Sequence, residues 1–295
     1  MVSDKVWSVG KNETPRHGVG MNLEFHNGLS GCQVRLLDGV VVKSCSPPYE
    51  SRLESQCKKQ KSFRNYDLKN IEVPTVIDKG IGWFSMEYAG GADFFSFLEK
   101  ASKQDLDSIV DTLSCYFDFF EKRSRPSSDT TRCNIVNKIY SMQKTGLSFS
   151  ILENLLVVQE DLDIQSLPKS MCHGDLTFSN ILFTKNKLWL IDFLDTFVDS
   201  YILDFVKLKQ DLYYNWSMKT QNKSSLRLHQ TKKYIWCSLC ERKQNVIENE
   251  WFDFFDTLNI LRIEPYITDD KHRKVFSEIL KRTPYYENTY RSNGR

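Results

Sequence analysis

Two short apolar runs separated by a polar turn constrain the fold of this chain more than any other feature. The runs cover residues 181–183 and 188–191, and Lys-Asn-Lys lies between them. Short β-rich runs on either side of a turn predict a β-hairpin. The two ends of such a hairpin lie close together, so Asn180 before the first strand and Asp192 after the second are predicted neighbours.

The side chains at this open end favour a metal ion. An amide oxygen from Asn180 and a carboxylate from Asp192 are hard oxygen ligands of the kind that Mg²⁺ prefers. Asp175 lies five residues before Asn180, in the loop that leads into the hairpin. It is not needed as a ligand and is free to accept a proton. The alternative is a turn rich in Asp and Asn that has no chemical role.

The sequence H-G-D-x₄-N at residues 173–180, followed by I-D-F at 191–193, resembles the catalytic core of the aminoglycoside phosphotransferase and choline kinase group. These proteins are relatives of the protein kinases, which read H-R-D-x₄-N and D-F-G. The Gly in place of the Arg, and the Leu after I-D-F, are typical of the small-molecule branch. The resemblance implies an α+β, protein-kinase-like fold of two lobes. A small antiparallel sheet with one helix forms the N-lobe, and the C-lobe is larger and mainly helical.

A second hairpin is predicted nearer the N-terminus, where Asp-Gly joins the runs 32–37 and 40–45. The register that this turn fixes places Val34 opposite Lys43, with Val41 on the same face. A single ammonium on an apolar face is costly unless an anion pairs with it. The alternative is an edge-strand lysine whose charged head reaches solvent.

The resemblance implies roles for these residues in nucleotide binding. Lys43 would hold the α- and β-phosphates of ATP, and Val34 and Val41 would line the adenine pocket. The kinase template also gives this lysine a glutamate partner on the next helix. Glu50 and Glu54 are both candidates, and we choose Glu54 because it lies about one turn deeper in the helix.

Two more segments belong to the predicted nucleotide site. Gly-Leu-Ser-Gly at 28–31 is a candidate phosphate loop with Ser30 as a contact, although it could also be an ordinary turn. A strand expected at 82–88 ends in Glu-Tyr-Ala-Gly-Gly, which resembles the hinge between kinase lobes. By that resemblance the backbone from Glu87 to Ala89 would contact the purine.

The hinge implies a division of the chain. We expect an N-terminal nucleotide-binding lobe at residues 1–89 and a C-terminal catalytic and substrate-binding lobe at 90–295. Apolar residues spaced by three and four between 104 and 120 predict a long helix that packs into the core of the second lobe.

Supporting residues of the catalytic loop follow from the same resemblance. His173 would brace the loop, and Asp204 matches an Asp that supports it by hydrogen bonds. Only eleven residues separate Asp192 from Asp204, which leaves no room for the long activation segment of a protein kinase. A protein substrate is therefore disfavoured.

Composition excludes several other classes of protein. A net charge of +2 over 295 residues gives no general attraction to nucleic acid. No apolar run is long enough to span a membrane, and the first ten residues lack the core of a signal peptide. Eight cysteines without framework spacing indicate reduced thiols and a cytoplasmic location.

These features predict an ATP- and Mg²⁺-dependent phosphotransferase that moves the γ-phosphate to a hydroxyl of a small molecule. Asp175 would be the base, and Asn180 and Asp192 would hold the metal. We expect a sugar or sugar-like acceptor, because the chain after residue 205 is not as acidic as a pocket for polyamine antibiotics. Two alternatives stay open: a choline, amino-alcohol or aminoglycoside kinase, and a catalytically silent nucleotide-binding or scaffolding protein on the same fold.

Overall fold

The computed structural model describes residues 23–25, 32–143, 149–184, 187–221, 223–267 and 269–286. The chain forms two compact units. The first consists of residues up to Ala101 and of Phe178–Asp195, and the second of Ser102–Thr177 and the residues from Thr196 on. The lobe boundary predicted at residue 90 therefore lies inside the first unit, which also contains the hairpin that follows the catalytic loop.

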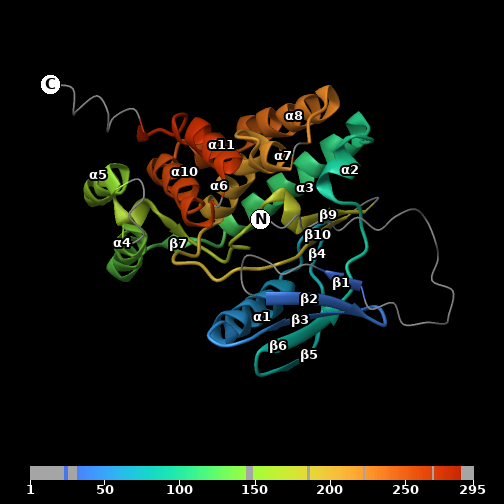
Figure 1. The fold of residues 1–295 in the computed structure, drawn as a ribbon. Coiled ribbons are helices and arrows are strands. Elements are labelled where there is room, and N and C mark those ends of the chain that lie inside the picture. Colours follow the sequence, from blue (N-terminus) through green and yellow to red (C-terminus); the bar gives the residue numbers. More distant parts are fainter. Residues whose placement is uncertain are drawn as a thin grey trace. The chain divides into compact units, whose positions relative to one another are not determined.

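The first unit is built on a five-stranded antiparallel sheet (Figure 1), whose strand order is β1-β2-β3-β6-β5. The strands are β1 (Leu23–Phe25), β2 (Cys32–Leu37), β3 (Val40–Cys45), β5 (Val76–Gly80) and β6 (Trp83–Glu87). Asp38 and Gly39 both have positive φ, 47° and 79°, which is the turn geometry that an Asp-Gly hairpin favours. The predicted register is confirmed, because Val34 lies opposite Lys43.

One face of this sheet packs on helix α1 (Glu50–Arg64). The core between them contains Leu53 and Cys57 from the helix and Cys32, Val41, Phe84 and Met86 from the strands. Lys43 points to the same side as Val41 and is buried with it. The predicted apolar face with a single lysine is therefore confirmed.

A three-stranded sheet of order β4-β10-β9 completes the first unit. Strands β9 (Ile181–Phe183) and β10 (Leu188–Leu190) form the predicted antiparallel hairpin, and β4 (Ile71–Glu72) pairs in parallel with β10. On the other side of β9, Ala92 pairs with Phe183 just before the short helix α2 (Phe94–Leu98). At Gly91 an added Cβ would lie only 3.0 Å from the Leu182 Cβ, so the backbone there runs directly against β9.

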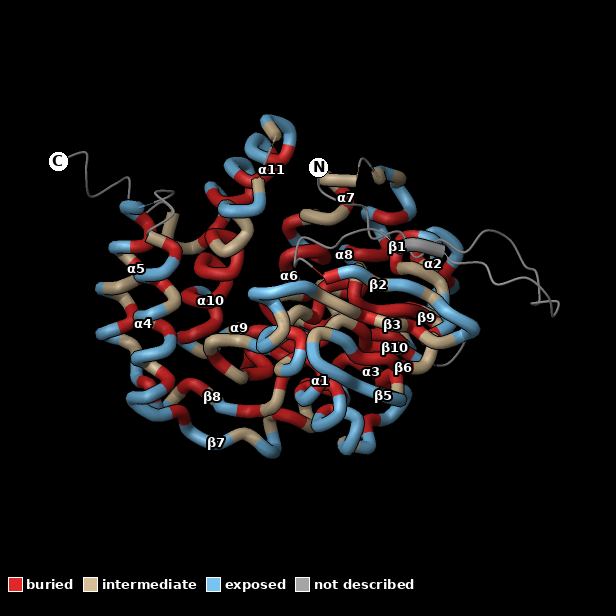
Figure 2. The backbone as a smooth tube through the Cα atoms, turned by 60° about the horizontal axis from the view of Figure 1, so that its bottom comes forward, coloured by how far each residue is buried: buried red, intermediate tan, exposed pale blue. Residues whose placement is uncertain are grey.

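The second unit is mainly helical. Its helices are α3 (Lys103–Glu121), α4 (Asp129–Gln143), α5 (Phe149–Asp161), α6 (Tyr201–Leu212), α7 (Trp216–Thr220), α8 (Leu226–Arg242), α9 (Gln244–Ile247), α10 (Glu250–Leu261) and α11 (Asp270–Leu280), with the short strands β7 (Arg125–Pro126) and β8 (Pro168–Lys169). Ser102 and Asp105 form a reciprocal cap at the start of α3. The predicted apolar stripe of α3 is buried, and Figure 2 shows that α6 and α10 are buried along most of their length.

Helix α6 contacts α3, α8 and α10 and lies at the centre of this unit. Its first turn is capped by the Ser200 hydroxyl, which accepts from the Ile202 N–H. In the part of the chain that the structure describes, no helix is both long and apolar enough to cross a membrane.

A buried lysine lies on α8. Only 1% of the surface of Lys232 is exposed, and its ammonium donates to the Asn215 side-chain oxygen. Burial lowers the pKa of Lys232 to about 8, although the nearby Asp211 carboxylate opposes this shift. The protonated form therefore destabilises the folded state relative to an unfolded chain, in which a lysine titrates near 10.4.

We expect stability to rise with pH as Lys232 loses its proton. Above pH 8 the unfolded chain binds more protons than the folded chain at this site, so the free energy of unfolding increases, by about 2 kcal/mol between pH 7 and 9.5. Urea unfolding at both pH values gives the free energy of unfolding of the wild type and of Lys232→Met. The free energy of the wild type minus that of the variant should increase between the two pH values by this amount. Replacement of the exposed Lys233 by Met is the control, and a pH-independent difference for Lys232→Met would contradict the prediction.

Candidate active site

Lys43 has an anionic partner in the first unit. Its ammonium, on a side chain only 6% exposed, lies 2.5 Å from a carboxylate oxygen of Asp192. It also donates to the side-chain oxygen of Gln56 at 2.6 Å. This pairing is what a buried ammonium requires, and it excludes the alternative of a lysine that reaches solvent.

The choice of Glu54 as the partner of Lys43 was wrong. Glu54 lies on the exposed face of α1 and pairs with Lys58, one turn along the helix, at 2.8 Å. The residues of α1 that face the sheet are Leu53, Gln56, Cys57 and Gln60, which follow the helical spacing of three and four. Gln56 therefore occupies the position facing Lys43, and its amide nitrogen has no hydrogen-bond partner within the described chain.

Asn180 and Asp192 lie at the open end of the β9–β10 hairpin. The Ile191 N–H donates to the Asn180 carbonyl at 3.0 Å, which extends the ladder by one pair and leaves Asp192 as the next residue. Asn180 is buried. Asp192 has a φ of 62°, in the left-handed region that Asp adopts more readily than most residues.

Asn180 and Asp192 suit a magnesium ion that takes its remaining ligands from phosphates and water. They are too few to form a metal site made of protein ligands alone. No group of three or more His, Cys, Asp or Glu side chains that could hold a metal occurs among the described residues. Asn180 and Asp192 offer one amide oxygen and one carboxylate. Mg²⁺ in nucleotide sites commonly uses one or two carboxylates and takes its other ligands from phosphates and water.

The predicted adenine-pocket residues lie on and beside the main sheet. Val41 is part of the buried core and Val34 packs against it. Ala89 is buried against Leu182 and Ile191 of the hairpin region. Ser30, the predicted phosphate contact, lies outside the described residues.

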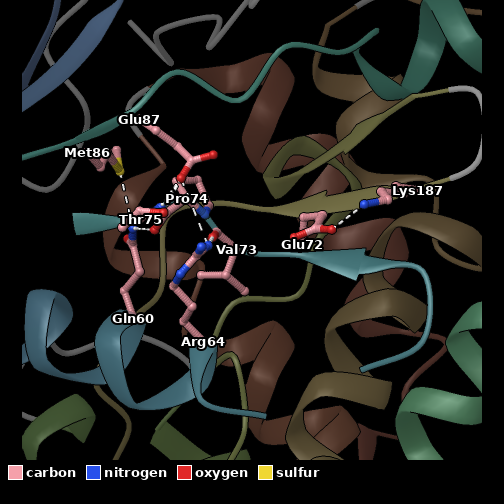
Figure 3. Close-up of polar contacts among 9 residues, drawn as sticks. All are labelled: Gln60, Arg64, Glu72, Val73, Pro74, Thr75, Met86, Glu87 and Lys187. Atoms are coloured by element: carbon pink, nitrogen blue, oxygen red, sulfur yellow. Dashed lines mark hydrogen bonds and ion pairs between the residues drawn. The ribbon is translucent and has the colours of Figure 1, made fainter. Parts of the chain in front are cut away.

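Figure 3 shows how Glu87 is held at the end of β6. Its carboxylate accepts hydrogen bonds from the hydroxyl and the backbone N–H of Thr75, and Arg64 lies 3.9 Å away. The Glu87 N–H donates to the Thr75 carbonyl at 2.9 Å. The Glu87 N–H is therefore already used by Thr75.

The catalytic loop of the second unit is fixed by Asp204, which is fully buried. The Asp204 carboxylate accepts from the backbone N–H of His173 at 2.6 Å and of Gly174 at 2.9 Å, and from the Tyr116 hydroxyl at 2.5 Å. Burial and this carboxylate raise the pKa of Tyr116 well above its ordinary value, so the hydroxyl stays protonated and donates.

The backbone of the loop explains one departure from the protein kinase pattern. Gly174 has a φ of 89°, which a side-chain-bearing residue adopts only with strain. The next residue, Asp175, donates its N–H to the Nδ1 of His173 at 3.2 Å. His173 is thus hydrogen-bonded to Asp204 through its backbone and to Asp175 through its ring.

Sequence reasoning missed one residue near the predicted base. The Lys207 ammonium lies 3.1 Å from the Asp175 carboxylate. Lys207 follows Asp204 by three residues on α6, so the two lie on the same side of the helix. That spacing was the only signal in the sequence.

The structure thus assembles the predicted residues in two groups, one within each unit. Lys43, Asn180 and Asp192 belong to the first unit, and His173, Asp175 and Asp204 belong to the second. The nucleotide and metal residues contain the Lys43–Asp192 pair. The loop residues contain the contacts of Asp204.

Solved structures with the same fold are phosphotransferases. A Plasmodium vivax ethanolamine kinase aligns with a TM-score of 0.60 and 13% identity, over 92% of this chain and 83% of that one. The GDP complex of aminoglycoside 2'-phosphotransferase-IIIa aligns with a TM-score of 0.57 and 14% identity, over 92% of this chain and 93% of that one. ADP-bound aminoglycoside phosphotransferase APH(2'')-Ib aligns with a TM-score of 0.51 and 15% identity, over 90% of this chain and 93% of that one. At these identities the likeness shows the fold, which is the predicted α+β, protein-kinase-like one.

The sequence comparisons identify the family. No curated protein sequence matches the chain significantly. The model of the APH family, described as the phosphotransferase enzyme family, matches residues 23–230, which is more than half of the chain. The chain therefore belongs to the APH phosphotransferase enzyme family, and it is a small-molecule kinase of that family's kinase-like fold.

Proposed function

We propose that this kinase transfers the γ-phosphoryl group of ATP to a hydroxyl of a sugar or sugar-like metabolite, with Asp175 as the general base. The observation that carries the proposal is the ion pair between the buried Lys43 of β3 and the half-buried Asp192 at the end of the β9–β10 hairpin. Phosphoryl transfer depends mainly on neutralising phosphate charge and on aligning the reactants, and this pair supplies groups for both.

The residues of the first unit would bind the nucleotide. Lys43 would hold the α- and β-phosphates, with Val34, Val41 and Ala89 around the base. Asn180 and Asp192 would hold Mg²⁺, which when bound neutralises negative charge on the phosphates. Two of the solved structures with this fold were obtained with ADP or GDP, which supports a nucleotide as the phosphoryl donor.

The loop residues of the second unit would act on the acceptor. Asp175 would orient the acceptor hydroxyl and accept its proton as the oxygen attacks phosphorus. Its position depends on the loop backbone, which Asp204 holds through the N–H groups of His173 and Gly174.

The charge beside Asp175 favours a neutral acceptor over a cationic one. Choline, ethanolamine and aminoglycosides all carry positive charge, and the fold neighbours include kinases named for the last two. In this chain the Lys207 ammonium lies next to the predicted base, and the charge of Arg262 acts on Lys207. These two cations offset the negative charges of Asp175 and Asp211, which also act on Lys207. The surroundings of the predicted base therefore offer a cationic acceptor little attraction, and a neutral sugar loses nothing by its lack of charge.

Replacement of the predicted base should remove turnover but not nucleotide binding. We expect Asp175→Asn to lower kcat by a factor on the order of 10² to 10⁴, because an amide cannot accept the proton. Phosphate transfer from ATP to a panel of sugars, amino alcohols and aminoglycosides measures this loss and identifies the acceptor. Unchanged turnover in Asp175→Asn would exclude the assignment. A wild type that binds ATP but phosphorylates no acceptor would favour the catalytically silent alternative.

Replacement of Asp192 should instead remove the response to Mg²⁺ and ATP. Ligand binding to the folded state raises the melting temperature, and Asp192→Ala lacks the carboxylate proposed to hold the metal. We expect the melting-temperature increase that Mg²⁺ and ATP cause in the wild type to be lost in this variant. Replacement of the exposed Asp67 of the same unit by Ala is the control. An increase of the same size in Asp192→Ala would contradict the metal role.

A further inference from the structure

One side of helix α6 contacts the catalytic loop at more than one point. Asp204 accepts hydrogen bonds from the backbone N–H groups of His173 and Gly174. Lys207, three residues further along the helix, reaches the side chain of Asp175 at 3.1 Å. The same helix face therefore contacts both the backbone of the loop and the carboxylate proposed to be the base.

The position of Lys207 is costly for an ammonium. Its side chain is only 13% exposed, and an ammonium out of water needs compensating charge. The charged groups that face it are Asp175 from the loop, Asp211 from the next turn of α6 and Arg262 after α10. Burial lowers the pKa of Lys207, and Arg262 adds to this effect, while Asp175 and Asp211 oppose it.

The catalytic loop carries no cation of its own near Asp175. Residues 176–179 read Leu-Thr-Phe-Ser, so no lysine or arginine occurs between Asp175 and Asn180. The positive charge beside the carboxylate is thus supplied by α6, a helix that begins 26 residues after Asp175. Because α6 is packed among α3, α8 and α10, that charge is fixed in position.

We propose that Lys207 is a positioning residue for phosphoryl transfer, whose ammonium holds the Asp175 carboxylate in one orientation. This inference rests on the proposed function. In the reaction the acceptor oxygen forms the new bond to the γ-phosphorus, and its proton passes to Asp175. The bond from that phosphorus to the β,γ-bridging oxygen breaks, and its electron pair leaves with ADP. Lys207 keeps its proton throughout.

The chain offers a matched control on the same helix. Lys209 is also 13% exposed, and it pairs with the buried Asp256 at 2.7 Å. Lys209 and Lys207 therefore have equal burial and one carboxylate partner each, but Asp256 lies in the core between α6 and α10, away from the catalytic loop. Replacement of Lys209 by Met tests the effect of losing a buried ion pair of α6 without touching Asp175.

The experiment compares Lys207→Met, Lys207→Arg and Lys209→Met in steady-state phosphate transfer by the full chain. We expect Lys207→Met to lower kcat on the order of 10- to 100-fold, since a misplaced catalytic group costs rates of this size. The KM for ATP and the melting-temperature increase caused by Mg²⁺ and ATP should not change. Lys207→Arg should recover most of kcat, and Lys209→Met should retain it even if its melting temperature falls.

The pH dependence of kcat separates positioning from a merely structural role. In the wild type, kcat should fall on the alkaline side as Lys207 loses its proton, at a pH below that of an ordinary lysine. In Lys207→Arg this fall should move to higher pH, because arginine stays protonated. In Lys209→Met the profile should match that of the wild type.

If the wild type is active, two outcomes would overturn the role of Lys207 and leave the proposed function standing. One is a wild-type kcat and pH profile in Lys207→Met. The other is an equal loss of kcat in Lys209→Met, which would assign the effect to weakened packing of α6. A wild type that neither binds ATP nor transfers phosphate to any acceptor would overturn the proposed function, and the role of Lys207 with it.

Discussion

The buried carboxylate of Asp204 is the interaction on which the second unit depends. A carboxylate removed from water costs several kcal/mol unless hydrogen bonds replace its hydration. Here those bonds come from the Tyr116 hydroxyl on α3 and from two consecutive N–H groups of the catalytic loop. The loop is consequently tied to two helices of the core by the requirement to satisfy one charge. Lys207 then lies beside Asp175 because it shares a helix face with Asp204.

Local rules were sufficient for the two hairpins. An Asp-Gly turn fixes the register of its flanking strands, so the pairing of Val34 with Lys43 could be predicted before any tertiary contact was known. The burial of that lysine could not, because an edge-strand lysine that reaches solvent was equally compatible with the register. The placement of Asn180 and Asp192 at one end of the β9–β10 hairpin could likewise be predicted from the turn and its flanking strands. The role expected of Asp204 came from family resemblance, because no local pattern marks an acid on a helix as a ligand of a distant loop.

Contacts between distant segments could not be predicted in the same way. The partner of Lys43 on α1 was sought among acidic residues, and the structure has the neutral Gln56 there, although the spacing of Leu53, Gln56 and Cys57 already marks the buried face of α1. The charged partner is Asp192, which is far from Lys43 in the sequence. Lys207 was missed because its partner lies in a loop far away in the sequence.

Gly91 shows what the pairing of Ala92 with β9 requires. At Gly91 the backbone runs against β9 with no space for a side chain, since a Cβ would come within 3.1 Å of the Phe183 carbonyl. The hairpin that presents Asn180 and Asp192 is therefore held against the chain leaving β6 by direct backbone contact. A residue without any reactive group thus holds β9 of this hairpin in place, and a search for functional residues by chemical type would pass over a position where any added side chain meets the backbone of β9.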